Sequence, residues 1–217
     1  MSAVRICLFA LLGLAAGLAL GWIGSGWSPR PEGDPPRSRL AQVVAMAILG
    51  AAAFALSAAR FHPLGVAALL GPFILLVAEV ALIDARTKLI PNRLVYPALG
   101  AALAAVLAGT LAGSHLSIGH GLIGLAVYGG GLLLIALAAP SSMGMGDVKL
   151  AALIGLVLGS VTLTAVWRAA LAGIFAGGIG ALVALTVFRY GRRQAIPYGP
   201  FLAIGAIAAA ITIPRTG

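Results

Sequence analysis

Two aspartates stand out as the side chains best able to do chemistry in this sequence. Asp84 closes one long apolar run, and Asp147 stands just before another, with glycines at 144 and 146. Only five of the 217 residues are acidic, and a charge beside a lipid bilayer is costly and commonly functional. Two carboxylates held close together share one proton, so that one can act as general base and the other as general acid. The pair therefore suggests hydrolysis by an aspartyl dyad.

Each aspartate alone also has a purely structural interpretation. Asp147 in the first turn of a helix would cap that helix, and Asp84 could pair with Arg86 or Lys88 among lipid headgroups. The glycines around residue 145 favour the catalytic interpretation, because glycine lets a substrate backbone approach closely. The occurrence of both aspartates together favours it further.

The elements that must position these residues are membrane helices. The chain is 61% hydrophobic and only 9% charged, whereas an ordinary soluble domain carries about 25% charged residues. Its apolar runs approach the ~20 residues that cross a bilayer. We therefore predict an all-α, polytopic membrane helix bundle with an N-terminal two-span segment (residues 1–63) and a six-span core (64–217). The eight predicted spans are residues 6–23, 41–59, 64–83, 94–113, 118–139, 150–166, 169–188 and 198–213.

The basic residues predict the topology. The net charge of +9 does not indicate nucleic-acid binding, because the basic residues lie singly or in short clusters between spans. Ten of the fourteen lie in the loops after the first, third, fifth and seventh spans. The positive-inside rule puts these loops in the cytoplasm and both termini in the periplasm. Asp84 and Asp147 would then face the cytoplasm together.

Glycines spaced by four residues predict close contacts between helices. Four such sets occur, at Gly13/Gly17/Gly21, Gly109/Gly113, Gly155/Gly159 and Gly173/Gly177.

Three short segments resemble the type IV prepilin peptidases, which are membrane aspartyl proteases of the GxGD kind. The first is the Asp84 segment that runs into Ile90-Pro91-Asn92, and the second is Gly144-Met145-Gly146-Asp147-Val148-Lys149-Leu150. The third, Ile196-Pro197-Tyr198-Gly199-Pro200, precedes the last span. The resemblance covers residues 64 to 213, and the three segments together are far more specific than a lone GxGD.

The resemblance implies an activity and a set of site residues. Asp84 and Asp147 would be the catalytic pair of an inner-membrane endopeptidase that needs no cofactor. It would remove the basic leader of prepilins or pseudopilins at the cytoplasmic face, for type IV pili or type II secretion. Residues expected to shape the site or bind substrate are Gly144, Gly146, Lys149, Pro91, Asn92, Pro197, Tyr198, Gly199, Pro200 and Glu79.

The chain departs from the long members of this family in its first loop. Those members carry cysteine pairs there that bind zinc, and they also methylate the new N-terminus. The loop between Gly24 and Leu40 contains no cysteine. We therefore expect a peptidase without methyltransferase activity and without a metal site.

Two other classes of function stay open at this stage. A small secondary transporter would use acidic residues near broken helices, and it predicts acids at the membrane midplane and internal repeats. A non-catalytic membrane subunit of a pilus assembly would use both aspartates only as helix caps. If the chain is a peptidase, the helix dipoles suggest that Asp147, near a helix N-terminus, is the ionised base and that Asp84, near a C-terminus, holds the proton.

Overall fold

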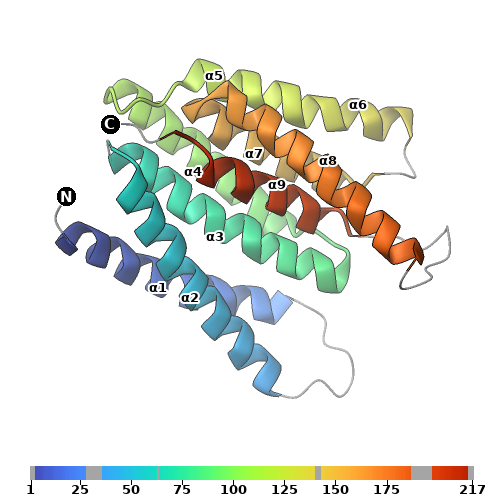
Figure 1. Ribbon diagram of the computed structural model, residues 1–217, viewed down its shortest axis with the longest axis horizontal. Helices are drawn as coiled ribbons and strands as arrows, with labels where there is room; N and C mark the ends of the chain where they lie inside the picture. The colour runs from blue at the N-terminus through green and yellow to red at the C-terminus, as the bar shows by residue number, and fades with distance from the viewer. Residues whose placement is uncertain (1–2, 28–35, 63, 140–142, 187–196, 215–217) are drawn as a thin grey trace.

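The computed structural model describes residues 3–27, 36–62, 64–139, 143–186 and 197–214, and it confirms a polytopic helix bundle (Figure 1). Over these residues every regular element is a helix. Their bounds are α1 Ala3–Trp27, α2 Pro36–Arg60, α3 Leu64–Thr87, α4 Asn92–Leu111, α5 Ile118–Gly124, η1 Leu125–Gly129, α6 Gly130–Ala138, α7 Met145–Val161, α8 Leu163–Thr186 and α9 Gly199–Ile211. Helix α5, the π-helical turn η1 and α6 follow one another without a break.

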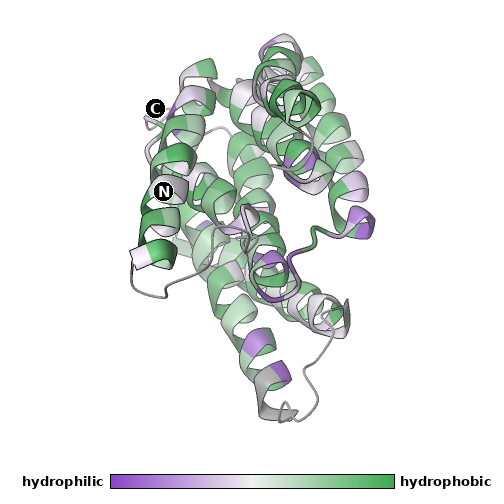
Figure 2. Cartoon of the chain, turned by 90° about the vertical axis from the view of Figure 1, so that its right-hand side faces the viewer, coloured by the Kyte–Doolittle hydropathy of each residue, from purple (hydrophilic) through white to green (hydrophobic). Residues whose placement is uncertain are grey.

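Among the described residues, six helices are long and apolar enough to cross a membrane. They are residues 3–26, 39–60, 64–87, 92–111, 118–138 and 163–186. The other two predicted spans form α7, with 17 residues, and α9, with 13. Hydrophobic residues dominate all of these helices (Figure 2).

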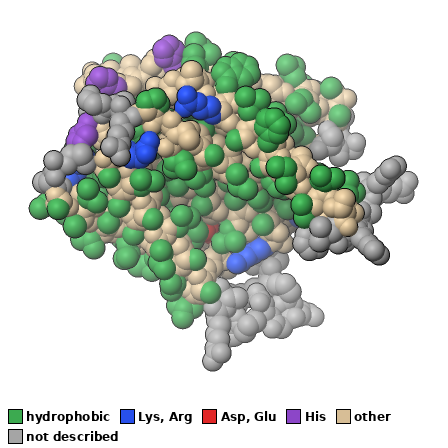
Figure 3. Space-filling view, viewed as in Figure 1, with side chains coloured by type: hydrophobic (Ala, Val, Ile, Leu, Met, Phe, Trp, Pro, Cys, Tyr) green, Lys and Arg blue, Asp and Glu red, His purple; other side chains and the backbone are tan. Residues whose placement is uncertain are grey.

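Both termini lie at one end of the bundle in Figure 1, where histidine side chains also gather in Figure 3. We call this the terminal end. The α3–α4 connection and the starts of α7 and α9 lie at the opposite end, which we call the motif end (Figure 1).

The predicted boundary between the sixth and seventh spans was displaced. We expected a loop near Arg168, but the chain turns at Thr162, whose φ of −164° and ψ of 135° end α7. Arg168 lies inside α8 and donates a 3.0 Å hydrogen bond to the backbone oxygen of Thr212. An arginine that caps another helix does not need to lie in a loop.

Close helix contacts occur at three of the four predicted glycine sets. A Cβ atom on Gly13 would lie 2.2 Å from the Gly50 backbone oxygen, and one on Gly155 would lie 2.2 Å from that of Gly124. Gly173 faces Phe201 of α9. The set at 109/113 was wrong: Gly109 contacts Ser114 and Leu116 of the following turn, and Gly113 has a φ of +67° in that turn.

Helices α3 and α7 lie at the centre of the bundle, with most of their residues buried. Helix α9 packs against both of them and against α8. These three helices therefore bring the three sequence segments to the motif end.

Candidate active site

Asp84 projects from the last turn of α3 to the beginning of α9. Its side chain is only 4% exposed. The Gly199 amide, at the first residue of α9, donates a 2.9 Å hydrogen bond to Oδ2 of Asp84. Burial disfavours the ionised carboxylate, whereas this bond and the positive end of the α9 dipole favour it.

Asp147 is the third residue of α7, outside the six candidate spans, and its amide bonds to the Gly144 oxygen at 3.1 Å. Burial and the negative charge of Asp84 raise the pKa of Asp147 to about 6, against the opposing effect of the Gly144 backbone amide. The structure thus brings two aspartates from different helices into electrostatic contact. That arrangement can share one proton and can perform general acid–base chemistry on a peptide bond.

The described part of the third sequence segment, residues 197–200, forms the turn that begins α9. The Tyr198 backbone oxygen accepts hydrogen bonds from the amides of Phe201 and Leu202, at 3.0 and 3.2 Å. Pro197 directly precedes this turn, and Pro200 fits inside it because the first turn of a helix has no use for its missing N–H. Burial, followed by the charge of Asp147, raises the pKa of the Tyr198 phenol. Tyr198 therefore lies near enough to Asp147 for the charge of that carboxylate to act on it.

Position 199 requires glycine because the beginning of α9 lies very close to the side chain of Asp84. A Cβ atom at this position would lie 2.7 Å from Oδ2 of Asp84 and 3.1 Å from its Cβ. Real Cβ atoms essentially never come within 3.0 Å of another heavy atom. A larger residue would therefore push α9 away from the carboxylate.

Gly146 lets the segment around Asp147 pack closely against the segment that contains Ile90. A Cβ atom there would lie 2.9 Å from Cβ of Ile90, so glycine lets the first turn of α7 pack against the α3–α4 connection. Pro91 ends this connection, and its oxygen accepts from the amides of Leu94 and Val95 at 3.0 and 3.2 Å. Gly144 stands at the start of α7 in extended conformation.

Lys149 and Asn92 meet at the edge of the site. The Nζ of Lys149 donates a 3.0 Å hydrogen bond to Oδ1 of Asn92 and lies 4.8 Å from the centre of the Tyr96 ring. This contact ties the beginning of α4 to the beginning of α7. It gives both predicted residues a positioning role.

Glu79 belongs to a separate polar network on α3. Its side chain is fully buried and accepts a 2.9 Å hydrogen bond from Nε2 of Gln42, whose Oε1 accepts from Arg86. A Cβ atom on Gly24 would collide with Oε1 of Glu79. This network joins α2 to α3 beside α1. Sequence reasoning missed Gln42, although a lone glutamine within an apolar run is the kind of signal that marks such a network.

Histidine plays no part in this site. His62 contacts Arg5 at the terminal end, and His115 and His120 flank the start of α5. Within the described ranges, no group of three or more His, Cys, Asp or Glu residues could hold a metal ion.

The region that contains these residues also resembles known proteins. The model of the type IV leader peptidase family matches residues 69–213. A prepilin leader peptidase/N-methyltransferase from Bacillus subtilis (strain 168) is 34% identical over 137 residues, which cover 63% of this chain and 52% of that protein. The chain thus spans about half the length of this relative. No solved structure matches.

Proposed function

We propose an activity from the premise that this chain belongs to the type IV leader peptidase family. The activity is that of a membrane aspartic endopeptidase, which removes the leader peptide of a prepilin or pseudopilin. The observation that carries the proposal is the pair of carboxylates, with Asp84 bound by the Gly199 amide and Asp147 held beside it.

We assign the two carboxylates opposite roles in the free enzyme. From the sequence we expected Asp147 to be ionised, since it lies near the N-terminus of its own helix. That argument omitted α9, whose first amide donates to Asp84. In the revised assignment Asp84 is the base and Asp147 carries the shared proton.

The chemistry follows from this assignment. Ionised Asp84 takes a proton from a water molecule, and the water oxygen attacks the scissile carbonyl carbon. Protonated Asp147 donates a hydrogen bond to the carbonyl oxygen, which becomes negative as the tetrahedral intermediate forms. Asp84 then gives the proton that it took from water to the leaving amine as the C–N bond breaks. The pair again holds one proton, on Asp147.

The active site is proposed to face the cytoplasm at the inner membrane. The distribution of basic residues supports this side, because ten of the fourteen fall, by sequence, between the predicted spans that the positive-inside rule connects in the cytoplasm, as do the two aspartates. A leader peptide rich in basic residues would remain on that side. The biological setting would be type IV pilus assembly or type II secretion.

We also propose that the chain does not methylate the new N-terminus, because its first loop has no cysteine. The relative from Bacillus subtilis is named for both activities. An assay of labelled methyl transfer to the mature prepilin should be negative, with a bifunctional relative as the positive control.

The decisive experiment is co-expression of a prepilin with wild type, Asp84→Asn or Asp147→Asn. Each variant should leave the prepilin at its precursor size on a gel, while Asp34→Asn, outside the described residues, should process normally. Size-exclusion profiles of the purified variants would show that they are folded. Normal processing by either dyad variant would overturn the aspartyl mechanism.

A further inference from the structure

A buried tyrosine that the proposed mechanism does not use lies inside the bundle. Tyr128 is 5% exposed and belongs to the π-helical turn η1, between α5 and α6. This turn packs tightly on α7, because a Cβ atom on Gly129 would lie 2.6 Å from Cβ of Ala152. Turns of this kind are rare and frequently occur at functional sites. The polar group that this turn carries into the bundle is the Tyr128 hydroxyl.

The Tyr128 hydroxyl reaches the contact between α8 and α9. A Cβ atom on Gly173 of α8 would lie 3.4 Å from this hydroxyl and 3.3 Å from the backbone oxygen of Phe201. One turn further along α8, a Cβ atom on Gly177 would lie 3.0 Å from Cε2 of Tyr198. The two tyrosines therefore contact one face of α8, at positions about 6 Å apart along its axis.

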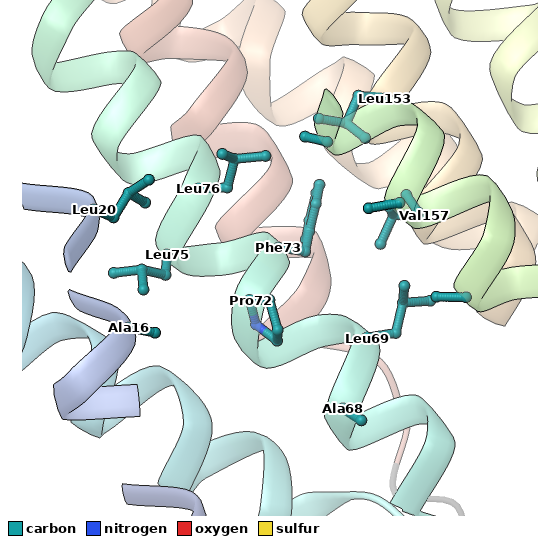
Figure 4. Close-up of a pocket in the computed structure, with 14 residues that line it drawn as sticks. Ala16, Leu20, Ala68, Leu69, Pro72, Phe73, Leu75, Leu76, Leu153 and Val157 are labelled. Carbon is teal, nitrogen blue, oxygen red and sulfur yellow. The ribbon is translucent and has the colours of Figure 1, made fainter. Parts of the chain in front are cut away.

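Elsewhere around α7 the interior is strongly apolar. The cavity of about 380 Å³ between α1, α3 and α4, which Leu153 and Val157 of α7 also line, is bordered only by alanine, leucine, proline, phenylalanine and valine (Figure 4). A buried phenol normally has a hydrogen-bond partner. For the Tyr128 hydroxyl, the Phe201 oxygen and the Tyr198 phenol at the α8–α9 contact are the candidates.

Electrostatic contacts extend from this tyrosine to the dyad. Tyr128 lies within electrostatic range of Tyr198, and Tyr198 lies within range of Asp147. Asp147 is in turn within range of Asp84. The two phenols therefore form a series that ends at the carboxyl to which we assign the shared proton.

We propose that Tyr128 and Tyr198 are positioning residues for Asp147, joined to it by a chain of hydroxyl hydrogen bonds. Tyr198 donates to one oxygen of the Asp147 carboxyl, directly or through one water molecule, and Tyr128 donates to the Tyr198 oxygen. Because a phenol has a single proton to donate, Tyr128 keeps that of Tyr198 directed at Asp147. The chain orients the O–H of Asp147 toward the scissile carbonyl. This inference rests on the proposed function, in which Asp147 is the acid.

The chain predicts the direction of a pKa change. A hydrogen bond donated to a carboxylate favours its ionised form, so loss of either hydroxyl should raise the pKa of Asp147 above about 6. Asp84 of α3, whose charge also acts on Asp147, is unchanged in such variants. Lys149, on the same helix as Asp147, bonds to Asn92 in place of the carboxyl.

Removing one hydroxyl at a time tests the chain. Tyr128→Phe and Tyr198→Phe keep the aromatic rings and their packing on α8. Each should lower kcat for prepilin cleavage about three- to tenfold, the effect of one lost hydrogen bond, and the double variant should lose no more. Tyr128→Phe should leave KM unchanged, because this hydroxyl lies inside the bundle. The control, Ser160→Ala, removes a buried hydroxyl that donates to Val157 of its own helix, and should change neither constant.

A second measurement requires no cleavage. The difference in thermal midpoint between an enzyme and its Asp147→Asn form, followed from pH 4 to 9, gives the pH range over which Asp147 ionises in the folded protein. In the Tyr128→Phe enzyme this range should lie about 0.5–1 pH unit higher than in the wild type. In the Ser160→Ala enzyme it should not move.

The outcomes separate this proposal from the proposed function. An unchanged kcat and ionisation range in Tyr128→Phe, with a lower thermal midpoint, would make its hydroxyl only an anchor to the Phe201 oxygen and would overturn the chain. Additive losses of kcat in the double variant would also overturn it. Normal processing by Asp147→Asn would overturn the proposed function, and the ionisation range would still show whether Tyr128 acts on Asp147.

Discussion

The Gly199 amide donates a 2.9 Å hydrogen bond to the Asp84 carboxylate, across 115 residues of sequence. The bond places an aspartate from the end of one helix at the beginning of another. The position of α9 thereby determines whether Asp84 can accept this bond, which favours its ionised form.

Gly199→Ala should reduce prepilin cleavage about tenfold or more. The added Cβ would lie 2.7 Å from Oδ2 of Asp84, and hydrogen bonds to charged groups contribute about 1.5–3 kcal/mol. Cleavage rates of purified enzyme measure the effect. Gly100→Ala is the control, because nothing lies within 4 Å of a Cβ there. Equal rates for the two variants would contradict the positioning role of α9.

The cleavage rate should fall as pH rises through about 6. The acid form of Asp147 is required, and burial with the charge of Asp84 raises its pKa to about 6. Above this value the protonated fraction falls about tenfold for each pH unit. Initial cleavage rates measured between pH 5 and 9 would show this fall. A rate that stays constant from pH 6 to 9 would show that Asp147 is not the required acid.

Asp147→Asn should stabilise the folded protein more at pH 8 than at pH 5. A carboxyl whose pKa is raised on folding, here from 3.8 to about 6, destabilises the fold progressively as pH rises between these two values, and fully above the second. Asparagine removes that cost, which is larger at pH 8 than at pH 5. Thermal unfolding in detergent at both pH values measures the difference. A gain that is larger at pH 5 would reverse the inferred sign.

Lys149→Met and Asn92→Ala should have effects that do not add. Both remove the same 3.0 Å hydrogen bond at an exposed position, where such pairs contribute about 0.2–1 kcal/mol, and Lys149→Met also removes the contact with the Tyr96 ring. The thermal midpoint should therefore fall by about 1–3 °C in Asn92→Ala, by at least as much in Lys149→Met, and no further in the double variant than in Lys149→Met. Additive losses would show that the two side chains act independently.

Arg60→Met and Arg168→Met should each lower the thermal midpoint by about 2–4 °C. The two arginines donate hydrogen bonds to the backbone oxygens of Ile213 and Thr212, at 3.2 and 3.0 Å. Each bond contributes about 0.5–1.5 kcal/mol at the C-terminus of α9. Arg93→Met, at the motif end, is the charge-matched control. A larger loss in the control would argue against this capping.

The fold was largely predictable because long apolar runs have few alternatives in a membrane. Over the described residues, each of the eight predicted runs lies mostly in helix, and the run 150–166 crosses the break at Thr162. One error was the break between spans that was expected near Arg168. Its partner, the Thr212 oxygen, lies 44 residues further along the chain, so local sequence could not reveal it.

The candidate site residues could be named from the sequence, but their contacts could not. Asp84 and Asp147 were singled out as charges beside apolar runs, and their catalytic roles stay a prediction; the structure places both at the motif end. Gly146 was expected to make room for substrate, whereas it makes room for Ile90. The Gly199 bond to Asp84 and the Glu79–Gln42 pair join distant segments, and helix periodicity contains no information about such contacts.

The shortness of α7 and α9 has a consequence for access of water to the site. With 17 and 13 residues, they extend about 26 Å and 20 Å, less than the ~30 Å thickness of the hydrocarbon core. Both helices are mostly buried among longer ones, so protein, and not lipid, surrounds the depth that they do not cross. Irregular backbone at such a depth is tolerated where it lines a water-filled cavity, and a cavity at the beginnings of α7 and α9 would let water and a peptide bond reach Asp84 and Asp147.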